Sequence, residues 1–395
     1  MKRLIALLAA LMLTLTACAK KPVPPTSPNA TGATQVTEPK EDVYLRDSYS
    51  VPKQTAIAHR DKVVATIGDA KLTNGLLQIF YWNGYYGFLS DVGDKLLFYG
   101  LDTGRPLDTQ KFLDKDGTWQ HFFLEKALGN WHNYQLMTLQ AQQENIPLAP
   151  KYQELIDKIP QSLEEKRAET GFATLDEMIQ ADAGPAATAA DYMVYQELYY
   201  RYLNYYDHVI NATTFTDEQV DAWFGENETG LASSGITKET IGYDVRHILV
   251  KVAEGKTDAD WAKCQADAQA ILDQWLAGEK TEDSFADLAK EKSQDGGSAP
   301  NGGLYSDLTR NTSFAQPFKN WYLDSGRQVG DYGLVKTDYG CHVMYFCGSG
   351  TIWQEYCRAV MLNNAVAEKL NGIITDNPPT IDYKSISLGI VNLSK

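Results

Sequence analysis

The chain has 395 residues and a formal net charge of −15. These values argue against nucleic acid as a partner, because the chain has no long basic run to meet phosphates. The length left after a short N-terminal segment is enough for two domains.

The first residues have the pattern of a bacterial export signal. Lys2 and Arg3 give a positive start, and the apolar run 4–16 is too short to span a bilayer. Leu15-Thr16-Ala17-Cys18 is typical of a lipobox, where the chain is cut before a cysteine that carries the lipid. We therefore expect a lipoprotein signal peptide over 1–18 with lipidation at Cys18. The alternative is an ordinary signal peptide with an incidental cysteine.

Residues 19–58 are expected to form a flexible tether. The segment opens with a Pro-, Thr- and Ser-rich stretch that cannot bury a core. No later stretch is apolar enough to cross a membrane, so the lipid would supply the anchoring. Together these features predict a protein held at the extracytoplasmic face of the bacterial cell membrane.

Residues 59–238 predict a mostly helical domain. A short hairpin is expected at 63–72 around Gly68, because two strand-like runs flank a turn there. Helical patterns separated by Pro and Gly follow it, at 76–89, 119–144, 152–170, 175–180 and 189–209. A capped helix beginning at Thr216 closes the domain.

Aromatic side chains crowd two helices of this domain. They are Phe80, Tyr81, Trp82, Tyr85 and Tyr86 on one, and Tyr199, Tyr200, Tyr202, Tyr205 and Tyr206 on the other. Consecutive aromatics on a helix point in several directions, so we interpret most of them as core. The alternative is an amphipathic cleft that holds unfolded polypeptide.

Residues 239–350 predict a small α+β domain with an antiparallel sheet. The expected elements are a strand at 243–252, helices at 258–276 and 282–292, a third helix after Pro317, and strands at 328–337 and 341–347. Residues 351–395 predict a C-terminal helix and tail that pack on the helical domain. The fold class is therefore α+β, with the sheet domain inserted in, or following, a helical domain.

The cysteines after Cys18 give no metal-binding signal. Cys264, Cys341, Cys347 and Cys357 lack CxxC spacing, which argues against zinc or thioredoxin-like chemistry. We interpret all four as small buried apolar residues and leave a disulfide as the alternative. Neither a metal nor a cofactor is expected.

Two histidines, an acid and a hydroxyl lie on separate elements of the second domain. His247 follows Arg246 in the first strand, Asp295 ends Ser293-Gln294-Asp295, and His342 follows Cys341 in the last strand, five residues after Thr337. With the Gly-rich loop 296–303, this order resembles the parvulin family of peptidyl-prolyl isomerases. The chain as a whole is similar to the extracellular foldase lipoproteins and periplasmic chaperones of that family, the PrsA and SurA groups.

The resemblance implies the site residues. His247, Asp295, Thr337 and His342 match the catalytic positions, and the proline pocket matches Leu304, Phe314 and Phe318. The chain departs from the family's Gly-Gly-Asp-Leu-Gly-x-Phe pattern, since it reads Gly302-Gly303-Leu304-Tyr305-Ser306-Asp307. The implied reaction is rotation about X-Pro bonds, without a covalent intermediate, in secreted polypeptides that are still partly unfolded.

Two other functions stay open at this stage. One is a holdase chaperone whose parvulin-like domain binds chains without turning them over, which the departure at Leu304 motivates. The other is a solute- or wall-binding lipoprotein. Homodimerisation, the client proteins and the residue preferred before proline are not readable from the sequence.

Overall fold

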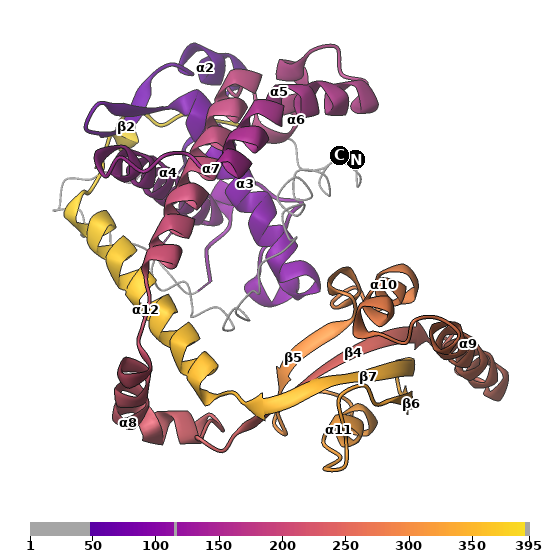
Figure 1. The fold of residues 1–395 in the computed structure, drawn as a ribbon. Coiled ribbons are helices and arrows are strands. Elements are labelled where there is room, and N and C mark those ends of the chain that lie inside the picture. The colour runs from indigo at the N-terminus through magenta and orange to yellow at the C-terminus, as the bar shows by residue number, and fades with distance from the viewer. Residues whose placement is uncertain (1–47, 114–116, 392–395) are drawn as a thin grey trace. The chain divides into compact units, whose positions relative to one another are not determined.

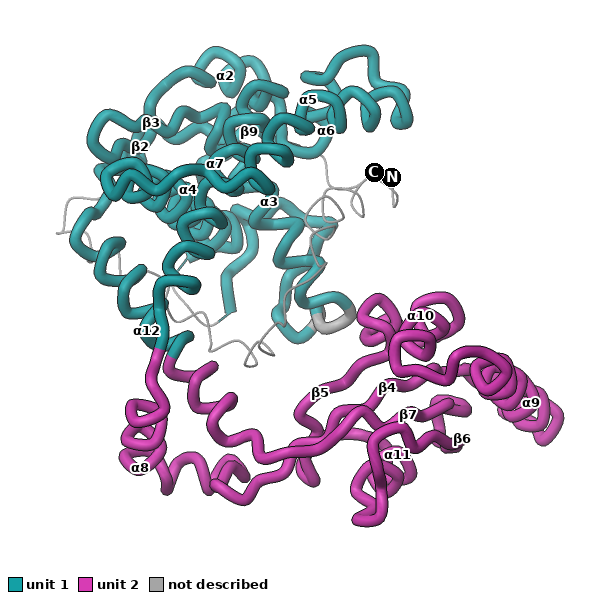
Figure 2. Tube along the Cα trace, viewed as in Figure 1, with its two compact units in different colours: residues 1–214, 362–395 teal, residues 215–361 magenta. Residues whose placement is uncertain are grey.

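The computed structural model describes residues 48–113 and 117–391. The predicted signal peptide, Cys18 and most of the predicted tether lie outside the described residues. Contacts divide the chain into two compact units (Figure 2). Unit 1 comprises residues 1–214 and 362–395, and unit 2 comprises residues 215–361. Unit 2 is therefore an insertion in the sequence of unit 1, and the fold class is α+β.

Unit 1 is mainly helical, and most of its helices begin at a threonine. Thr73, Thr118, Thr174 and Thr188 each accept a hydrogen bond from a backbone N–H of the first turn. Thr188 and Asp191 form a reciprocal capping box, which satisfies two backbone donors at once. Its elements (Figure 1) are β1 (Ser50–Val51), α2 (Lys53–Ala58), β2 (Val63–Ile67), β3 (Ala70–Thr73), α3 (Asn74–Val92), η1 (Gly93–Tyr99), η2 (Leu107–Thr109), α4 (Trp119–Gln143), α5 (Pro150–Thr170), α6 (Leu175–Ala183), α7 (Ala189–Ala212), the later part of α12 (Trp353–Asp376), β8 (Thr380–Ile381), η4 (Tyr383–Ser385) and β9 (Leu388–Gly389).

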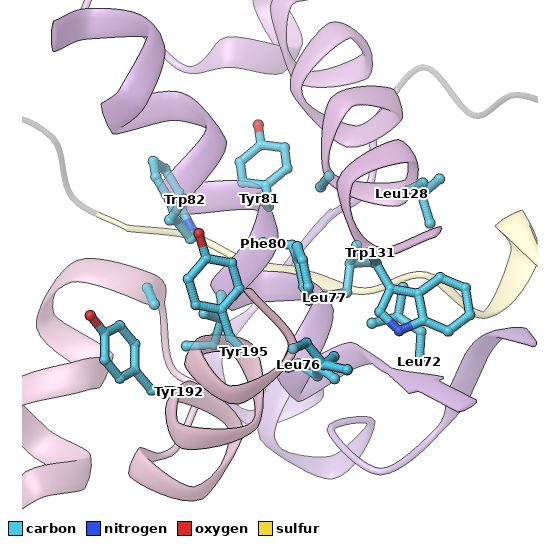
Figure 3. Close-up of a cluster of buried hydrophobic side chains, with 14 of the residues drawn as sticks. Leu72, Leu76, Leu77, Phe80, Tyr81, Trp82, Leu128, Trp131, Tyr192 and Tyr195 are labelled. Atoms are coloured by element: carbon cyan, nitrogen blue, oxygen red, sulfur yellow. The ribbon is translucent and has the colours of Figure 1, made fainter. Parts of the chain in front are cut away.

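Aromatic rings fill the space between α3, α4 and α7 (Figure 3). Phe80 meets Tyr195 edge to face with ring centroids 4.8 Å apart, a favourable geometry for two aromatic quadrupoles. Six of the crowded aromatics are buried, namely Phe80, Tyr81, Trp82, Tyr85, Tyr200 and Tyr205. The interpretation of most of them as core is confirmed.

The C-terminal segment completes two small sheets of unit 1. β8 pairs antiparallel with β2, and β9 pairs parallel with β1. The fully buried amide of Asn74 joins three segments there: it donates to the carbonyls of His59 (3.1 Å) and Ser385 (3.0 Å) and accepts from the N–H of Ser387 (2.8 Å).

The predicted tether ends earlier than expected. Residues 48–58 belong to unit 1, because Tyr49 and Ala56 are buried and β1 pairs with β9. The Gln120 side chain also holds this segment, accepting from Tyr49 N and donating to Ser50 Oγ. The prediction of a tether up to residue 58 is therefore wrong over its last eleven residues.

The boundary between the units also differs from the predicted boundary at 238. α8 (Asp217–Ser233) packs against the start of α12 through a cluster that includes Val220, Phe224 and Trp353. Arg358 of α12 donates to the carbonyl of Phe215 at 2.8 Å. Residues 215–238 and 351–361 therefore belong to unit 2, not to the helical domain and the C-terminal segment.

Unit 2 is built on a four-stranded antiparallel sheet with strand order β5-β4-β7-β6 (Figure 1). One face is covered by α9 and α10 over Ile248 and Val343, and the other by α11 over Val245 and Met344. Its elements are α8, β4 (Ile241–Lys251), α9 (Asp258–Leu276), α10 (Glu282–Lys292), η3 (Ala299–Asn301), β5 (Leu304–Leu308), α11 (Gln316–Tyr322), β6 (Tyr332–Thr337), β7 (Gly340–Thr351) and the start of α12. Within the described ranges, no helix is both long and apolar enough to cross a bilayer.

Asn74→Ala should lower the free energy of unfolding by about 2–4 kcal/mol. The change leaves two carbonyls and one N–H buried without their partner. Urea unfolding followed by circular dichroism measures the loss. Asn377→Ala is the control, since that exposed side chain bonds only the Ile373 carbonyl, and it should cost about 0.5 kcal/mol or less. Equal effects of the two substitutions would contradict the role of Asn74.

Candidate active site

The two histidines lie on the central strands of the unit 2 sheet. His247 of β4 is opposite Met344 of β7, and His342 is two residues from Met344, so both rings stand on the same face as diagonal neighbours. Their Nδ1 atoms are 3.0 Å apart, and the ring centroids are 5.2 Å apart. Both side chains are buried.

The loop after α10 brings a carboxylate to His247. Asp295 Oδ2 lies 2.9 Å from His247 Nε2 and accepts the hydroxyl of Ser298 at 2.5 Å. Backbone contacts fix the loop on β4: Gln294 N donates to the Leu249 carbonyl at 2.9 Å. Ser298 is also buried, and its Oγ is 3.0 Å from His247 Nε2.

Gly303 allows the loop to come this close to the strand. His247 N donates to the Gly303 carbonyl at 2.8 Å, and Gly303 has a φ of +73°. A Cβ at this position would lie 2.2 Å from the His247 carbonyl oxygen, which only glycine avoids. The second glycine of Gly302-Gly303 is thus explained by backbone approach.

Thr337 ends the chain of side-chain hydrogen bonds at His342. Its Oγ1 is 2.7 Å from His342 Nε2 and accepts a bond from Tyr339 N at 3.2 Å. Thr337 closes β6, and the β6–β7 turn returns the chain to Gly340. Threonine and histidine are therefore placed by one tight hairpin.

The network has one consistent arrangement of protons when both histidines are neutral. A carboxylate only accepts, so His247 carries its proton on Nε2 and presents a bare Nδ1. His342 must then donate from Nδ1, which leaves its Nε2 to accept the proton of Thr337. The order of donors runs from Thr337 through both rings to Asp295.

Burial and hydrogen bonding shift the pKa values of these groups. The hydrogen bond from His247 is the main reason why the pKa of Asp295 lies far below its usual range, against the opposing effect of burial. Burial lowers the pKa of His342 to about 4, with a further lowering by His247. The site therefore combines an ionised carboxylate with a neutral His342 at pH 7.

Aromatic rings border the imidazoles on the α11 side. Buried Phe318 meets His247 and His342 edge to face, at centroid distances of 5.3 and 5.4 Å. Phe314 stacks on Phe318 at 5.0 Å with an interplanar angle of 16°. Tyr305 of β5 meets Phe314 edge to face at 4.9 Å. These three rings form a continuous aromatic wall beside the polar network.

Leu304 does not belong to this wall, contrary to the expectation. Leu304 is opposite Arg246, which shares its face of β4 with Ile248, on the side covered by α9 and α10. Tyr305 is opposite Val245 on the histidine side. Alternation along β5 therefore turns Leu304 away from the site and puts Tyr305 in its place.

Sequence reasoning missed Tyr305 and Ser298. The Tyr305 hydroxyl donates to Asp295 Oδ2 at 2.9 Å. The sequence Leu-Tyr-Ser-Asp-Leu at 304–308 shows no apolar alternation, so no strand was predicted there and Tyr305 was not singled out. Ser298 sits in a Gly-rich loop, where no periodic pattern indicates its direction.

The other predicted site residues lie close together in space, and their roles in catalysis stay predictions. They are His247, Asp295, Thr337, His342, Phe314 and Phe318. Among the described residues, no group of three or more His, Cys, Asp or Glu side chains is placed to hold a metal ion. Cys264, Cys341, Cys347 and Cys357 are free thiols, and Cys347 is only half-buried.

Residues 247–347 match the family model described as Rotamase: PPIC-type PPIASE domain. This segment is a parvulin-type domain. The matched residues include every residue of the polar network and of the aromatic wall. No curated protein matches the chain.

Several solved structures are similar to the chain at low identity. PrsA from Bacillus subtilis shares 19% identity, with 68% of this chain and 91% of that chain covered, at a TM-score of 0.37. Foldase protein PrsA from Lactococcus lactis shares 10% identity, with 82% of this chain and 97% of that chain covered, at a TM-score of 0.31. A SurA-like chaperone from Campylobacter jejuni shares 17% identity, with 80% of this chain and 94% of that chain covered, at a TM-score of 0.23. At these scores the likenesses establish no function for this chain.

When both rings are neutral, imidazole nitrogen NMR should find His247 as the Nε2–H tautomer and His342 as the Nδ1–H tautomer. The reason is that Asp295 accepts from one end of the network, while Thr337 donates at the other. His247→Asn and His342→Asn spectra would assign the signals. The same tautomer at both rings, or a charged His342, would contradict this proton arrangement.

Stability should fall as the pH drops from about 6.5 towards 4, in part because of His342. Its pKa is lowered in the folded protein, so the unfolded chain takes up the proton first. This shift in pKa contributes roughly 3 kcal/mol to the free energy of unfolding. The contribution is complete above the pKa that His342 has in the unfolded chain and is lost below the pKa that it has in the folded protein. Urea unfolding at several pH values in this range measures the free energy of unfolding. This free energy should change less with pH in His342→Asn than in the wild type. Equal changes with pH would argue against a buried neutral imidazole.

Proposed function

We propose that the chain is a peptidyl-prolyl cis–trans isomerase that helps secreted proteins to fold. The observation that carries the proposal is the buried His247–His342 pair, held by Asp295 and flanked by Phe318, within a parvulin domain. The substrates would be partly unfolded polypeptides that contain X-Pro bonds.

The chemistry of prolyl rotation suits this arrangement. The barrier is roughly 18–20 kcal/mol because rotation breaks amide resonance. At the twisted transition state the carbonyl is less polar and the proline nitrogen more basic, so an environment poor in water favours it over the solvated planar amide. Phe318 provides the apolar surface, and the fixed imidazoles and carboxylate provide preorganised polar groups beside it.

A covalent route finds no support in the arrangement of the side chains. Asp295 occupies the position nearest His247, and its charge is already bound by the donors of His247, Ser298 and Tyr305. A carboxylate stabilised in this way is a poor nucleophile. The polar network therefore acts by fixing geometry and charge, not by forming a bond to the substrate.

We also propose that the protein works outside the cytoplasmic membrane, attached through a lipid on Cys18. The lipobox-like Leu15-Thr16-Ala17-Cys18 and the Pro-rich segment after it support this location. Cys18→Ser should prevent labelling by a radioactive fatty acid and release the protein from the membrane fraction. Unchanged labelling would overturn the assignment of Cys18.

A binding-only chaperone is the second candidate. Phe314 stacks directly on Phe318, and parallel rings 5.0 Å apart leave no layer for a proline ring between them. Suppression of aggregation of an unfolded client, without any acceleration of prolyl rotation, would favour this candidate over the isomerase.

His247→Ala, Asp295→Ala and Phe318→Ala should each lower kcat/KM for a proline peptide by roughly 10²-fold. Each removes a preorganised polar group or the apolar surface at the rotating bond. A protease-coupled isomerisation assay on the chain without residues 1–18 measures the rates. Asn320→Ala is the matched control, because Asn320 is exposed on the same helix as Phe318. Wild-type rates in all three variants would refute the site.

A further inference from the structure

Tyr305 links the two halves of the site, the polar network and the aromatic wall. Its hydroxyl donates to Asp295 Oδ2, and its ring lies 5.4 Å from the ring of His247 at an interplanar angle of 30°. The other edge of the same ring meets Phe314. Among the described residues, no other side chain bonds Asp295 and also has ring contacts with an imidazole and with Phe314.

We propose that Tyr305 is a positioning residue, whose phenol holds the Asp295 carboxylate in place while its ring supports Phe314. The inference rests on the proposed isomerase function, and it adds a residue that the resemblance does not assign. Tyr305 acts through its neighbours and need not touch the rotating bond.

The hydrogen bonds at Asp295 carry the first part of the inference. Three donors converge on Oδ2, from His247, Ser298 and Tyr305, while Gly297 N donates to Oδ1 at 3.3 Å. Of the three donors to Oδ2, Ser298 belongs to the same loop as Asp295, and the His247 imidazole must itself be oriented. Tyr305 is the donor from a separate strand, so it fixes the carboxylate from a direction that the loop cannot provide.

The phenol keeps its proton over the working range of pH. Burial, followed by the hydrogen bond to Asp295, raises the pKa of Tyr305 to about 12. Asp295 is faced by His247 from β4, His342 from β7 and Tyr305 from β5, and α11 presents Phe318 to them. The carboxylate therefore stays an acceptor and keeps His247 in one tautomer.

The ring contacts carry the second part. Phe314 lies between Tyr305 and Phe318, edge to face with the first and stacked on the second. A proline ring that packs on the covered face of Phe318 has to displace Phe314 towards Tyr305. The size and shape of residue 305 thus control how far Phe314 can move, and with it the affinity for substrate.

Two substitutions separate these roles. Tyr305→Phe removes the hydroxyl and keeps the ring, so kcat should fall about tenfold while KM stays constant. The Asp295 carboxylate should also protonate at higher pH than in the wild type, because it loses a donor and its pKa rises. Tyr305→Leu removes the ring as well and should change KM in addition. Tyr332→Phe, an exposed tyrosine of β6, is the matched control and should leave both constants unchanged.

Nuclear magnetic resonance distinguishes a failure of this inference from a failure of the proposed function. Carbon-labelled Asp295 should titrate at higher pH in Tyr305→Phe than in wild type, whether or not either protein turns over substrate. An inactive wild type with this shift would reject the isomerase and keep the positioning role. An unchanged Asp295 titration, or an unchanged kcat in an active enzyme, would overturn the inference.

A fluorinated tyrosine at position 305 serves if Tyr305→Phe does not fold. It keeps the shape of the residue and makes the phenol more acidic. Ionisation of the phenol then removes the donor at a lower pH, so both kcat and the His247 nitrogen signal should change at that pH. A profile identical to that of the unmodified protein would equally overturn the inference.

Discussion

A single carboxylate determines how the rest of the site is arranged. Because ionised Asp295 only accepts hydrogen bonds, it fixes the proton of His247, and that proton fixes those of His342 and Thr337 in turn. Burying several polar groups is costly unless each has a partner, and here each of them does. The β4–β7 register brings the two imidazoles together, and the Gly303 approach and the docking of the loop on Leu249 bring the carboxylate to them. Displacing Asp295 would leave the buried imidazoles without a defined orientation.

Unit 1 also contains a buried polar side chain with its hydrogen bonds satisfied, but there it has a different role. Asn74 is buried, and its amide joins the start of α3 to the segment that returns from the far end of the sequence. In unit 2 the satisfied polar groups orient rings at a candidate reaction site, whereas in unit 1 they hold together pieces of a discontinuous fold. In both units the apolar core supplies most of the favourable burial, and the polar groups select one arrangement of it.

Much of this structure could be predicted from the sequence because its signals are local. Thr caps, Gly and Pro breaks and apolar periodicity located the long helices. His247, Asp295, Thr337 and His342, which are not local to one another, were placed in one site only by the resemblance to the parvulin family. Short strands were missed, since β1, β8 and β9 have two residues each and depend on partners far along the chain. The error at Leu304 has the same origin. Only the pairing of β5 with β4 decides which of Leu304 and Tyr305 faces the histidines, and that pairing is not local.

The interrupted sequence of unit 1 has a consequence for the order of assembly. Ser50 pairs with Leu388 and Thr66 with Thr380, so these sheets cannot close until the last part of the chain has been made. All residues of unit 2 are available before that point. Until the C-terminal segment arrives, β1 and β2 of the helical unit each lack a strand partner. During that interval the protein has exposed strand edges, which are templates for pairing with another chain.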